Sequence, residues 1–239
     1  TAGGLAKAHV CDIRVAGAVD EMMDKIWLDG GALTGLVNNA AGNFISPTKD
    51  LSTNGFDAIS NIVFKGSFYV THACGKRWIE EKTKASVISI LTTWVWNGGP
   101  YTVPSAMSKA GINIMTKSLA AEWGKYGIRL NAISPGPFPT KGAWDRLNPG
   151  QGTDEDLGNS SIPMGRNGWM SELRNLATFL MADGCEYLTG QNIAIDGAAH
   201  LASGGNFYQS LDSLTDADWS GIKEMIKSSN EVDKSNRSN

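Results

Sequence analysis

The sequence of 239 residues has few cysteines, no run of Lys or Arg, and no apolar stretch near the roughly 20 residues that span a bilayer. Cys11, Cys74 and Cys185 are scattered, and an odd, unclustered set indicates reduced thiols rather than a disulfide framework or a zinc site. The formal net charge of −3 provides no basic face for nucleic acid. With no signal peptide at residue 1, we expect a bacterial cytoplasm or an organelle matrix, not secretion, and neither a membrane nor a nucleic-acid partner.

The chain contains regularly alternating strand-like and helix-like patterns. Hydrophobic residues make up 41% and charged residues 19%, and the length allows one large buried core. Short apolar runs indicate strands at 8–12, 35–38, 87–91, 128–133 and 192–195. Helical patterns cover 19–28, 54–82, 104–125 and 171–181, the last with Ser171 as its N-cap. The alternation predicts a single α/β domain over 1–239, a doubly wound parallel sheet with helices on both faces and a loose polar tail at 228–239.

Several short motifs occur in an order that is more specific than any one of them. Leu36–Gly42 is followed by Lys109–Gly111, then by Pro135–Pro137, and near the end by Ile195–Gly197. This ordered set resembles the short-chain dehydrogenase/reductase family, whose Rossmann-like fold it implies. Within the family the sequence is most similar to the mitochondrial-type 2,4-dienoyl-CoA reductases. That likeness covers nearly the whole chain and is carried by residues 39–48, 103–106, 135–143 and 214–219.

The proton-donating tyrosine usual in this family is missing. It stands four residues before the active-site lysine, and here Ser105 stands four before Lys109, on the same helix face. A serine also occupies this place in the dienoyl-CoA reductases, but a serine hydroxyl is a poor acid. Their own donor tyrosine lies fifteen positions before the lysine, where this sequence has Trp94. The nearby phenol is Tyr101, eight positions before Lys109; it either donates the proton or packs at a helix entrance, and in the second case a water is the donor.

The resemblance also assigns the remaining site residues. Lys109 would hold the nicotinamide ribose, and Asn43 would steady the thioester oxygen or dienolate as a neutral amide donor. The residues expected at the cofactor are Asp12 at the adenine, Asn39 and Ala40 at the adenosine, Pro135, Gly136 and Phe138 at the nicotinamide, and Thr140 at the pyrophosphate. Trp94, Trp96, Tyr101 and Phe138 could line an acyl slot, beneath a loop at 141–162. His9, His72 and His200 have no metal-ligand spacing, and we expect them to be structural.

The Gly-rich turn that binds the cofactor phosphates in such folds does not precede Asp12. We therefore expect at least one βαβ unit of about 30 residues to be absent from the sequence, and a chain that starts at Thr1 to bind dinucleotide poorly.

Together these features predict an NADPH-dependent reductase of a conjugated acyl-CoA thioester, with NADH not excluded. An ordinary alcohol or ketone dehydrogenase, such as a 3-oxoacyl reductase, is the first alternative, and a catalytically silent binding module is the second. We expect a homotetramer, because the helical patterns 54–82 and 104–125 carry small residues that permit close helix approach: Gly66, Ala73, Gly111 and Ala120.

Overall fold

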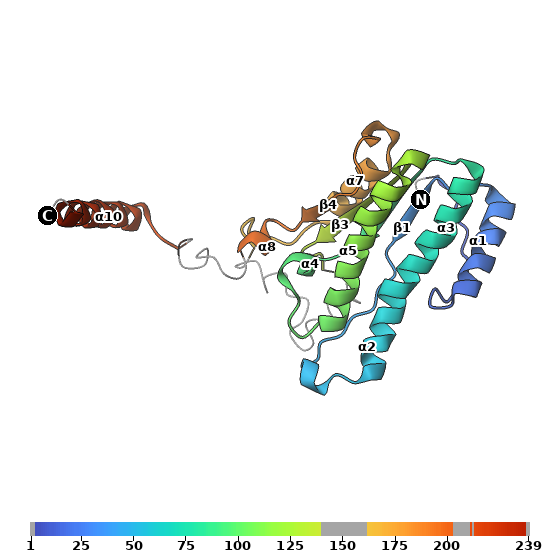
Figure 1. Cartoon of the computed structure of the whole chain (residues 1–239), viewed down its shortest axis with the longest axis horizontal. Coiled ribbons are helices and arrows are strands. Elements are labelled where there is room, and N and C mark those ends of the chain that lie inside the picture. The colour runs from blue at the N-terminus through green and yellow to red at the C-terminus, as the bar shows by residue number, and fades with distance from the viewer. Residues whose placement is uncertain (1–2, 140–161, 203–210, 212, 238–239) are drawn as a thin grey trace. The chain divides into compact units, whose positions relative to one another are not determined.

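The computed structural model describes residues 3–139, 162–202, 211 and 213–237 (Figure 1). By its internal contacts the chain divides into two compact units, Thr1–His200 and Leu201–Asn239. The first unit contains the sheet and every described site residue.

The first unit is built on a four-stranded parallel sheet in the order β1-β2-β3-β4. Its strands are β1 (Gly35–Asn38), β2 (Ala85–Ile90), β3 (Ile128–Pro135) and β4 (Asn192–Ile195). Leu36 pairs with Val87, and Val87 pairs with Leu130, so the register runs straight across β1, β2 and β3. The sequence prediction of a parallel α/β sheet is confirmed.

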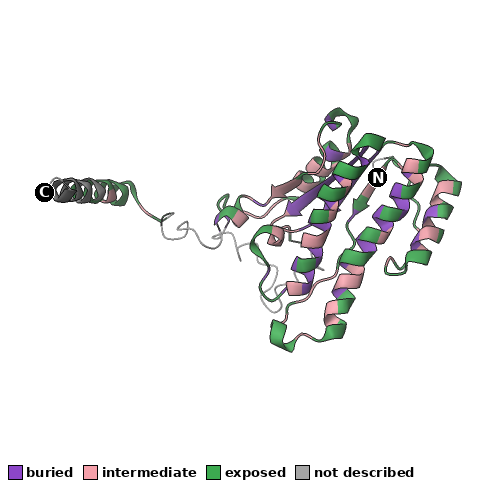
Figure 2. Cartoon of the chain, viewed as in Figure 1, coloured by how far each residue is buried: buried purple, intermediate pink, exposed green. Residues whose placement is uncertain are grey.

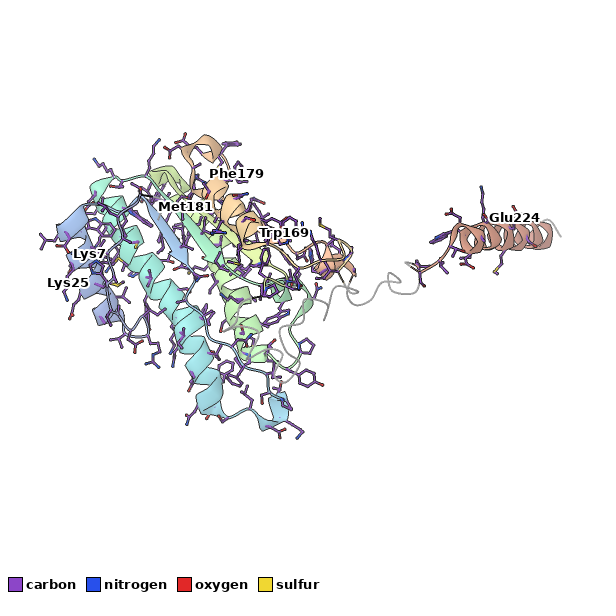
Figure 3. The ribbon with its side chains drawn as sticks, turned by 180° about the vertical axis from the view of Figure 1, so that it is seen from behind. Lys7, Lys25, Trp169, Phe179, Met181 and Glu224 are labelled. Carbon is purple, nitrogen blue, oxygen red and sulfur yellow. The ribbon has the colours of Figure 1, made fainter. Side chains whose placement is uncertain are left out.

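Helices cover both faces of this sheet, and the strand residues show which helix lies where. Val87 packs in the core that contains α1 (Ala16–Gly30), α3 (Ser67–Glu81) and α5 (Val103–Trp123). Its neighbour Ile88 packs with Leu180 of α7 (Met170–Met181). Successive strand residues point to opposite faces, so α7 covers the face opposite α1, α3 and α5. Figure 3, seen from behind, shows α7 on that side, with Trp169 and Phe179 at its two ends.

The long helical pattern at 54–82 forms one run that contains a π-helical stretch. It begins with α2 (Thr53–Ser60), whose N-cap Ser52 accepts a hydrogen bond of 3.1 Å from the Gly55 N–H. It continues through the π-helix η2 (Asn61–Gly66) into α3. Val63, within η2, is fully buried and packs against Ile112 of α5. Such π-helical turns are frequent at functional sites, and this one faces the helix that carries Lys109.

Short elements complete the first unit. They are the helix α4 (Trp94–Asn97), the 3-10 helices η1 (Thr48–Asp50), η3 (Gly124–Tyr126) and η5 (Asp183–Cys185), and the turn α8 (Ala199–Ala202), which begins in this unit. Buried residues concentrate in the strands and on the helix faces turned to them (Figure 2).

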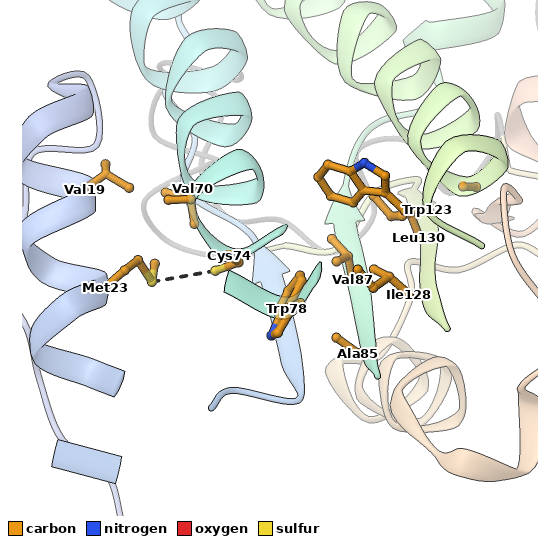
Figure 4. Close-up of a cluster of buried hydrophobic side chains, with 12 residues drawn as sticks. Val19, Met23, Val70, Cys74, Trp78, Ala85, Val87, Trp123, Ile128 and Leu130 are labelled. Carbon is orange, nitrogen blue, oxygen red and sulfur yellow. Dashed lines mark hydrogen bonds between the residues drawn. The ribbon is translucent and has the colours of Figure 1, made fainter. Parts of the chain in front are cut away.

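The core between the sheet and the helices is dense around Trp78, which is fully buried and donates a hydrogen bond of 2.7 Å to the Leu33 carbonyl. In the same cluster Cys74 Sγ lies 3.6 Å from the Met23 sulfur (Figure 4). Burial raises the pKa of the Cys74 thiol to about 12, so it stays protonated and behaves as a small apolar side chain.

Three sequence predictions differ from the structure. Residues 8–12 form no strand, because no described strand lies beside them to provide ladder hydrogen bonds. Ser171 is not the N-cap of its helix: α7 starts at Met170, and Glu172 accepts a hydrogen bond of 2.8 Å from the backbone N–H of the N-cap Trp169. The loose tail expected at 228–239 is helical through residue 237.

In the second unit the helix α10 (Asp216–Arg237) begins with a reciprocal cap. Thr215 N–H donates to the Asp218 carboxylate at 2.8 Å, and Asp218 N–H donates back to the Thr215 hydroxyl at 3.3 Å. The cap satisfies two of the donors that a helix start leaves open, and it gives a polar sequence a defined starting point for a helix.

The contact between α3 and α5 depends on a glycine. A Cβ atom at Gly75 would lie 2.3 Å from the Trp123 ring, whereas one at Gly17 in α1 would have no atom within 4 Å. We expect Gly75→Ala to lower the free energy of unfolding by about 1–3 kcal/mol through overpacking. The matched control Gly17→Ala should leave it unchanged or raise it by up to about 1 kcal/mol. Urea unfolding of both variants measures the difference, and an equally stable Gly75→Ala variant would contradict the packing described.

Candidate active site

The expected site residues converge on the edge of the sheet where the parallel strands end. Asn39, Ala40 and Asn43 follow β1, Trp94 follows β2, and Pro135 to Phe138 end and follow β3. Asp196, which the sequence analysis did not assign to the site, follows β4 at the same edge. Ligands of open α/β sheets bind in the crevice outside these carboxyl ends. The topology therefore brings together residues that are up to about 150 positions apart in the chain.

Lys109 lies at the centre of this edge, on α5 and only 6% exposed. Its amino group donates a hydrogen bond to the carbonyl of Ile90, the last residue of β2. Burial lowers the pKa of Lys109 to about 8, because the charged form loses its hydration. Ser105, one helical turn earlier, is buried as well. The structure thus keeps an amino group that is easily deprotonated next to a hydroxyl, and no phenol stands at that turn.

Tyr101 lies in a different environment from Lys109. It is 63% exposed, its backbone has a left-handed φ of 62°, and its carbonyl accepts a hydrogen bond of 2.8 Å from the Ser46 N–H. A positive φ is strained for an aromatic residue, and such strain gathers at functional sites. No hydrogen bond joins Tyr101 to Lys109 in the described part of the chain. Its role as a proton donor stays a prediction.

Asn43 is half-buried in the loop after β1. Its amide oxygen accepts a hydrogen bond of 2.9 Å from the Phe44 N–H. With the oxygen engaged in this way, the NH₂ end is the part of the side chain that can donate to a ligand. This orientation suits the stabilisation of a developing oxyanion, which the sequence analysis expected of Asn43.

The ends of β3 and β4 approach closely because of Gly136. A Cβ atom at this position would lie 2.5 Å from the Asp196 Cβ. The sequence analysis expected Gly136 at the nicotinamide, and the structure shows a separate reason for a glycine here, the contact between two strand ends. Beside it lies a hollow of about 70 Å³ lined by residues that include Pro137, Phe138, Arg166, Glu172 and Asp196.

The far side of this hollow is fixed by an ion pair that the sequence analysis did not find. Arg166 donates two hydrogen bonds to the Glu172 carboxylate, at 2.9 and 2.8 Å, and stacks over the Trp169 ring at 4.1 Å. The Arg166 guanidinium holds the pKa of Glu172 at about 2. This arrangement fastens the chain at 166–172 to the start of α7.

The sequence analysis also missed a histidine–aspartate pair at the end of β4. His200 Nδ1 lies 2.6 Å from Asp196 Oδ2, and the same carboxylate accepts hydrogen bonds from the Ala198 and His200 backbone N–H groups, at 3.0 and 2.8 Å. Trp96 of α4 stacks on the His200 ring, with centroids 4.8 Å apart. An aspartate and a histidine four residues apart, directly after the last strand, were the signal that could have revealed this pair.

The residues expected at the adenosine end lie at the surface. Asp12 is exposed and bound by Arg14 at 2.7 Å, and hydrogen bonds from Arg14 lower the pKa of Asp12 to about 2. Asn39 and Ala40 are exposed just after β1. Thr140 and the loop at 141–161 lie outside the described residues.

The described residues fit the nicotinamide-ribose end of a dinucleotide. Lys109 presents its amino group at the end of β2, and Pro135, Gly136 and Phe138 stand at and after the end of β3, the next strand in the sheet. The described residues contain no cluster of three or more His, Cys, Asp or Glu side chains that could hold a metal ion. None of the described helices is both long and apolar enough to cross a membrane.

A parallel α/β sheet with a buried lysine at its carboxyl edge is the arrangement that the sequence analysis expected, and comparison with known proteins gives the class of protein. Residues 1–200 match the family model described as enoyl-(acyl carrier protein) reductase. The chain belongs to the short-chain dehydrogenase/reductase family, and it is an oxidoreductase of that type.

Similar proteins extend over most of the chain. A Caenorhabditis elegans protein named as a probable 2,4-dienoyl-CoA reductase, (3E)-enoyl-CoA-producing, is 44% identical over 94% of this chain and 74% of its own length. A Bacillus subtilis protein named as a probable 2,4-dienoyl-CoA reductase, (2E)-enoyl-CoA-producing, is 39% identical over 80% of this chain and 75% of its own. The crystal structure of a short chain dehydrogenase from Bacillus anthracis has a TM-score of 0.71 and 40% identity, over 79% of this chain and 73% of that one.

The buried Lys109 gives a pH-dependent stability effect. Its pKa is 10.5 normally and about 8 in the folded protein, so the charged form favours the unfolded chain. This penalty is fully present below pH 8 and disappears as the pH rises to 10.5. Lys109→Met removes this penalty. We therefore expect the free energy of unfolding of the variant, relative to the wild type, to be roughly 2–3 kcal/mol higher at pH 7 than at pH 10.5.

Chemical denaturation at both pH values measures this effect. Comparing one variant at two pH values cancels the loss of the hydrogen bond to Ile90, which both measurements share. Lys117→Met, at an exposed lysine of the same helix, is the matched control and should show no such difference. An equal effect of Lys109→Met at both pH values would show that Lys109 is not buried as a titrating amine.

Proposed function

We propose that the protein is an NAD(P)H-dependent reductase of conjugated 2,4-dienoyl-CoA thioesters. The observation that carries this proposal is the buried pair of Lys109 and Ser105 on α5, which keeps the family's cofactor-binding lysine but has no phenol one turn before it. Ordinary alcohol–ketone interconversion needs that acid to protonate the substrate oxygen, whereas reduction of a conjugated thioester places both new hydrogens on carbon. Relatives named as 2,4-dienoyl-CoA reductases, 39–44% identical to this chain, support the same substrate class.

Each site residue has a defined part in this chemistry. A bound dihydronicotinamide supplies the hydride. Lys109 holds the ribose through its amino donors, and Pro135, Gly136 and Phe138 shape the wall next to the ring. The Asn43 NH₂ group donates to the thioester oxygen, where negative charge collects as the conjugated system accepts the electron pair. Ser105 holds substrate or cofactor by a hydrogen bond, and Tyr101 or a water is the proton source that the sequence suggests.

NADPH is the proposed cofactor, and NADH is the alternative. Activity assays with each of the two cofactors distinguish between them. Acyl-CoA is the proposed substrate, and fatty acid breakdown in a bacterial cytoplasm or an organelle matrix is the proposed setting. Since Trp94 and Ser105 occupy both tyrosine positions, a silent binding module is the second candidate.

Activity of the full-length protein tests the substrate class. We expect NADPH consumption with a 2,4-dienoyl-CoA, and little or none with a 3-oxoacyl-CoA or a simple ketone. Asn43→Ala should lower turnover by about 10²–10³-fold, as the loss of an oxyanion donor does. Asn54→Ala, at an exposed asparagine of α2, is the matched control. Turnover of the 3-oxoacyl thioester alone would establish the ketone reductase instead, and cofactor binding without any turnover would favour the silent module.

A homotetramer is also proposed, although on a different basis from the sequence prediction. The small residues serve packing within the chain: a Cβ at Gly111 would lie 2.6 Å from the Phe64 ring, one at Gly66 would lie 2.7 Å from Ile13, and Ala73 and Ala120 are buried. Three large apolar side chains of these helices are exposed: Phe68 of α3 and Met107 and Ile114 of α5.

Exposed apolar side chains on adjacent helices support association between copies. We expect sedimentation of the full-length protein at micromolar concentration to give a tetramer, and Ile114→Glu to shift it to smaller species. A monomeric wild-type protein would refute this proposal and leave the enzymatic one intact.

A further inference from the structure

Two loops at the carboxyl edge of the sheet, residues 39–47 after β1 and residues 98–102 after α4, are tied together. The Ser46 N–H donates a hydrogen bond of 2.8 Å to the Tyr101 carbonyl. Ile45, the residue before Ser46, is 43% exposed, and Tyr101 is 63% exposed. The hydrogen bond therefore makes neighbours of two large, exposed side chains that are far apart in the sequence.

The first loop is anchored by Phe44. Its ring packs against the buried cluster around Ile59 of α2, and a Cβ atom at Gly55 would lie 3.2 Å from the ring. Asn43 and Ile45, on either side of Phe44, are held with it. Because two residues of chain span at most about 7 Å, the Cα atom of Ile45 lies within that distance of the Asn43 Cα atom. Ile45 is thus adjacent to the residue proposed to bind the thioester oxygen.

The second loop is fixed on Trp94. A Cβ atom at Gly99 would lie 3.1 Å from two atoms of the Trp94 ring, and a glycine permits this approach. Gly98 has a φ of 76° and Tyr101 a φ of 62°, both in the left-handed region. A tyrosine keeps this conformation where its surroundings impose it, and such strain gathers at ligand clamps. The fold thus fixes the backbone of Tyr101 while its side chain stays exposed.

Two of the four aromatic residues expected at the acyl slot already pack against other parts of the chain. Phe138 lies against Gly168, where a Cβ atom would be 2.3 Å from the ring. Trp96 stacks on His200, with centroids 4.8 Å apart. Neither ring belongs to the two joined loops. The exposed apolar surface next to the proposed oxyanion donor comes from those loops instead.

We propose that Ile45 and Tyr101 form the contact for the hydrocarbon chain of the acyl thioester and set the chain length that the enzyme prefers. This inference rests on the proposed function and deepens it. With the thioester oxygen at Asn43, the alkyl chain beyond the conjugated carbons lies across the joined loops. A chain seated there removes both exposed side chains from water, which is the gain that apolar ligand sites use. A tyrosine suits this place, because its ring covers the chain while its hydroxyl stays hydrated.

On this assignment Tyr101 contributes contact area rather than a proton. In the part of the chain that the structure describes, no hydrogen bond joins Tyr101 to Lys109. The proton then comes from water. Tyr101→Phe separates the two roles, since phenylalanine keeps the ring and lacks the hydroxyl.

The test measures kcat and KM of the full-length protein with 2,4-dienoyl-CoA thioesters of six and of ten carbons. We expect Tyr101→Ala and Ile45→Ala each to raise KM for the ten-carbon substrate by on the order of 10-fold. The value of kcat should change little, because the lost contact is shared by the ground state and the transition state. The six-carbon substrate has a single methyl group beyond the conjugated carbons, so its KM should change by less than about threefold. Tyr101→Phe should match the wild type at both lengths.

Tyr126→Ala is the matched control. Tyr126 is 39% exposed and lies in η3, which precedes β3 at the opposite edge of the sheet. Lys125 lies over its ring, 5.0 Å from the centroid. This variant should leave the kinetic constants for both substrates unchanged. Thermal unfolding of the alanine variants shows whether each is folded as the wild type is.

A change of carrier shows which part of the substrate makes the contact. Thioesters of N-acetylcysteamine keep the acyl chain and lack most of CoA. The same loss at ten carbons with this carrier would support the acyl contact. A loss seen with CoA alone would assign Ile45 and Tyr101 to the carrier and overturn the proposal.

The remaining outcomes separate this inference from the proposed function. Losses of equal size at both chain lengths, or no loss, in an active enzyme would overturn the chain contact and leave the reductase in place. Tyr101→Phe without activity at either length would make the phenol the acid and overturn the contact role. A wild-type protein inert towards every dienoyl thioester would overturn the proposed function, and this inference with it.

Discussion

Burial of the Lys109 amino group at the Ile90 carbonyl is the interaction on which the rest of the site depends. A helix residue can reach a strand end in this way only if α5 packs closely on the sheet. The α3–α5 contact provides that closeness, since Trp123 of α5 lies directly over Gly75. The cost of holding an amine in an apolar setting appears as its lowered pKa. Folding thus maintains an unfavourable charge at the end of β2.

A second constraint acts at the neighbouring strand ends. Gly136 allows β3 and β4 to converge until Asp196 stands against β3, and Asp196 then directs the strained turn that places His200 beside Trp96. Lys109 is fixed to the end of β2, and His200 is fixed to Asp196, which directly follows β4. Catalytic groups on rigid elements keep their geometry better than groups on loops.

The sequence alone predicted the parallel sheet, the order of strands and helices along the chain, and the helix that carries Lys109. These could be predicted because apolar periodicity and ordered motifs are local signals. The sequence analysis missed what depends on three-dimensional proximity: the π-helical turn at Val63, the Arg166–Glu172 pair, and the Asp196–His200 pair. It assigned a strand to residues 8–12 from apolar content alone, although a strand needs a neighbour. It also interpreted Gly111 as an intersubunit contact, whereas that glycine accommodates Phe64 of the same chain.

Isotopic labelling tests the central claim most directly, because it locates both hydrogens that the reaction adds. The full-length protein would reduce a 2,4-dienoyl-CoA in D₂O with unlabelled NADPH, and NMR would locate the deuterium in the product. The account predicts one hydrogen from the cofactor at the δ-carbon and one deuterium from solvent on another carbon of the former conjugated system, at the α-carbon of a 3-enoyl thioester or the γ-carbon of a 2-enoyl thioester. A hydroxyl product, formed by reduction of a carbonyl and carrying no solvent deuterium on carbon, would contradict the account.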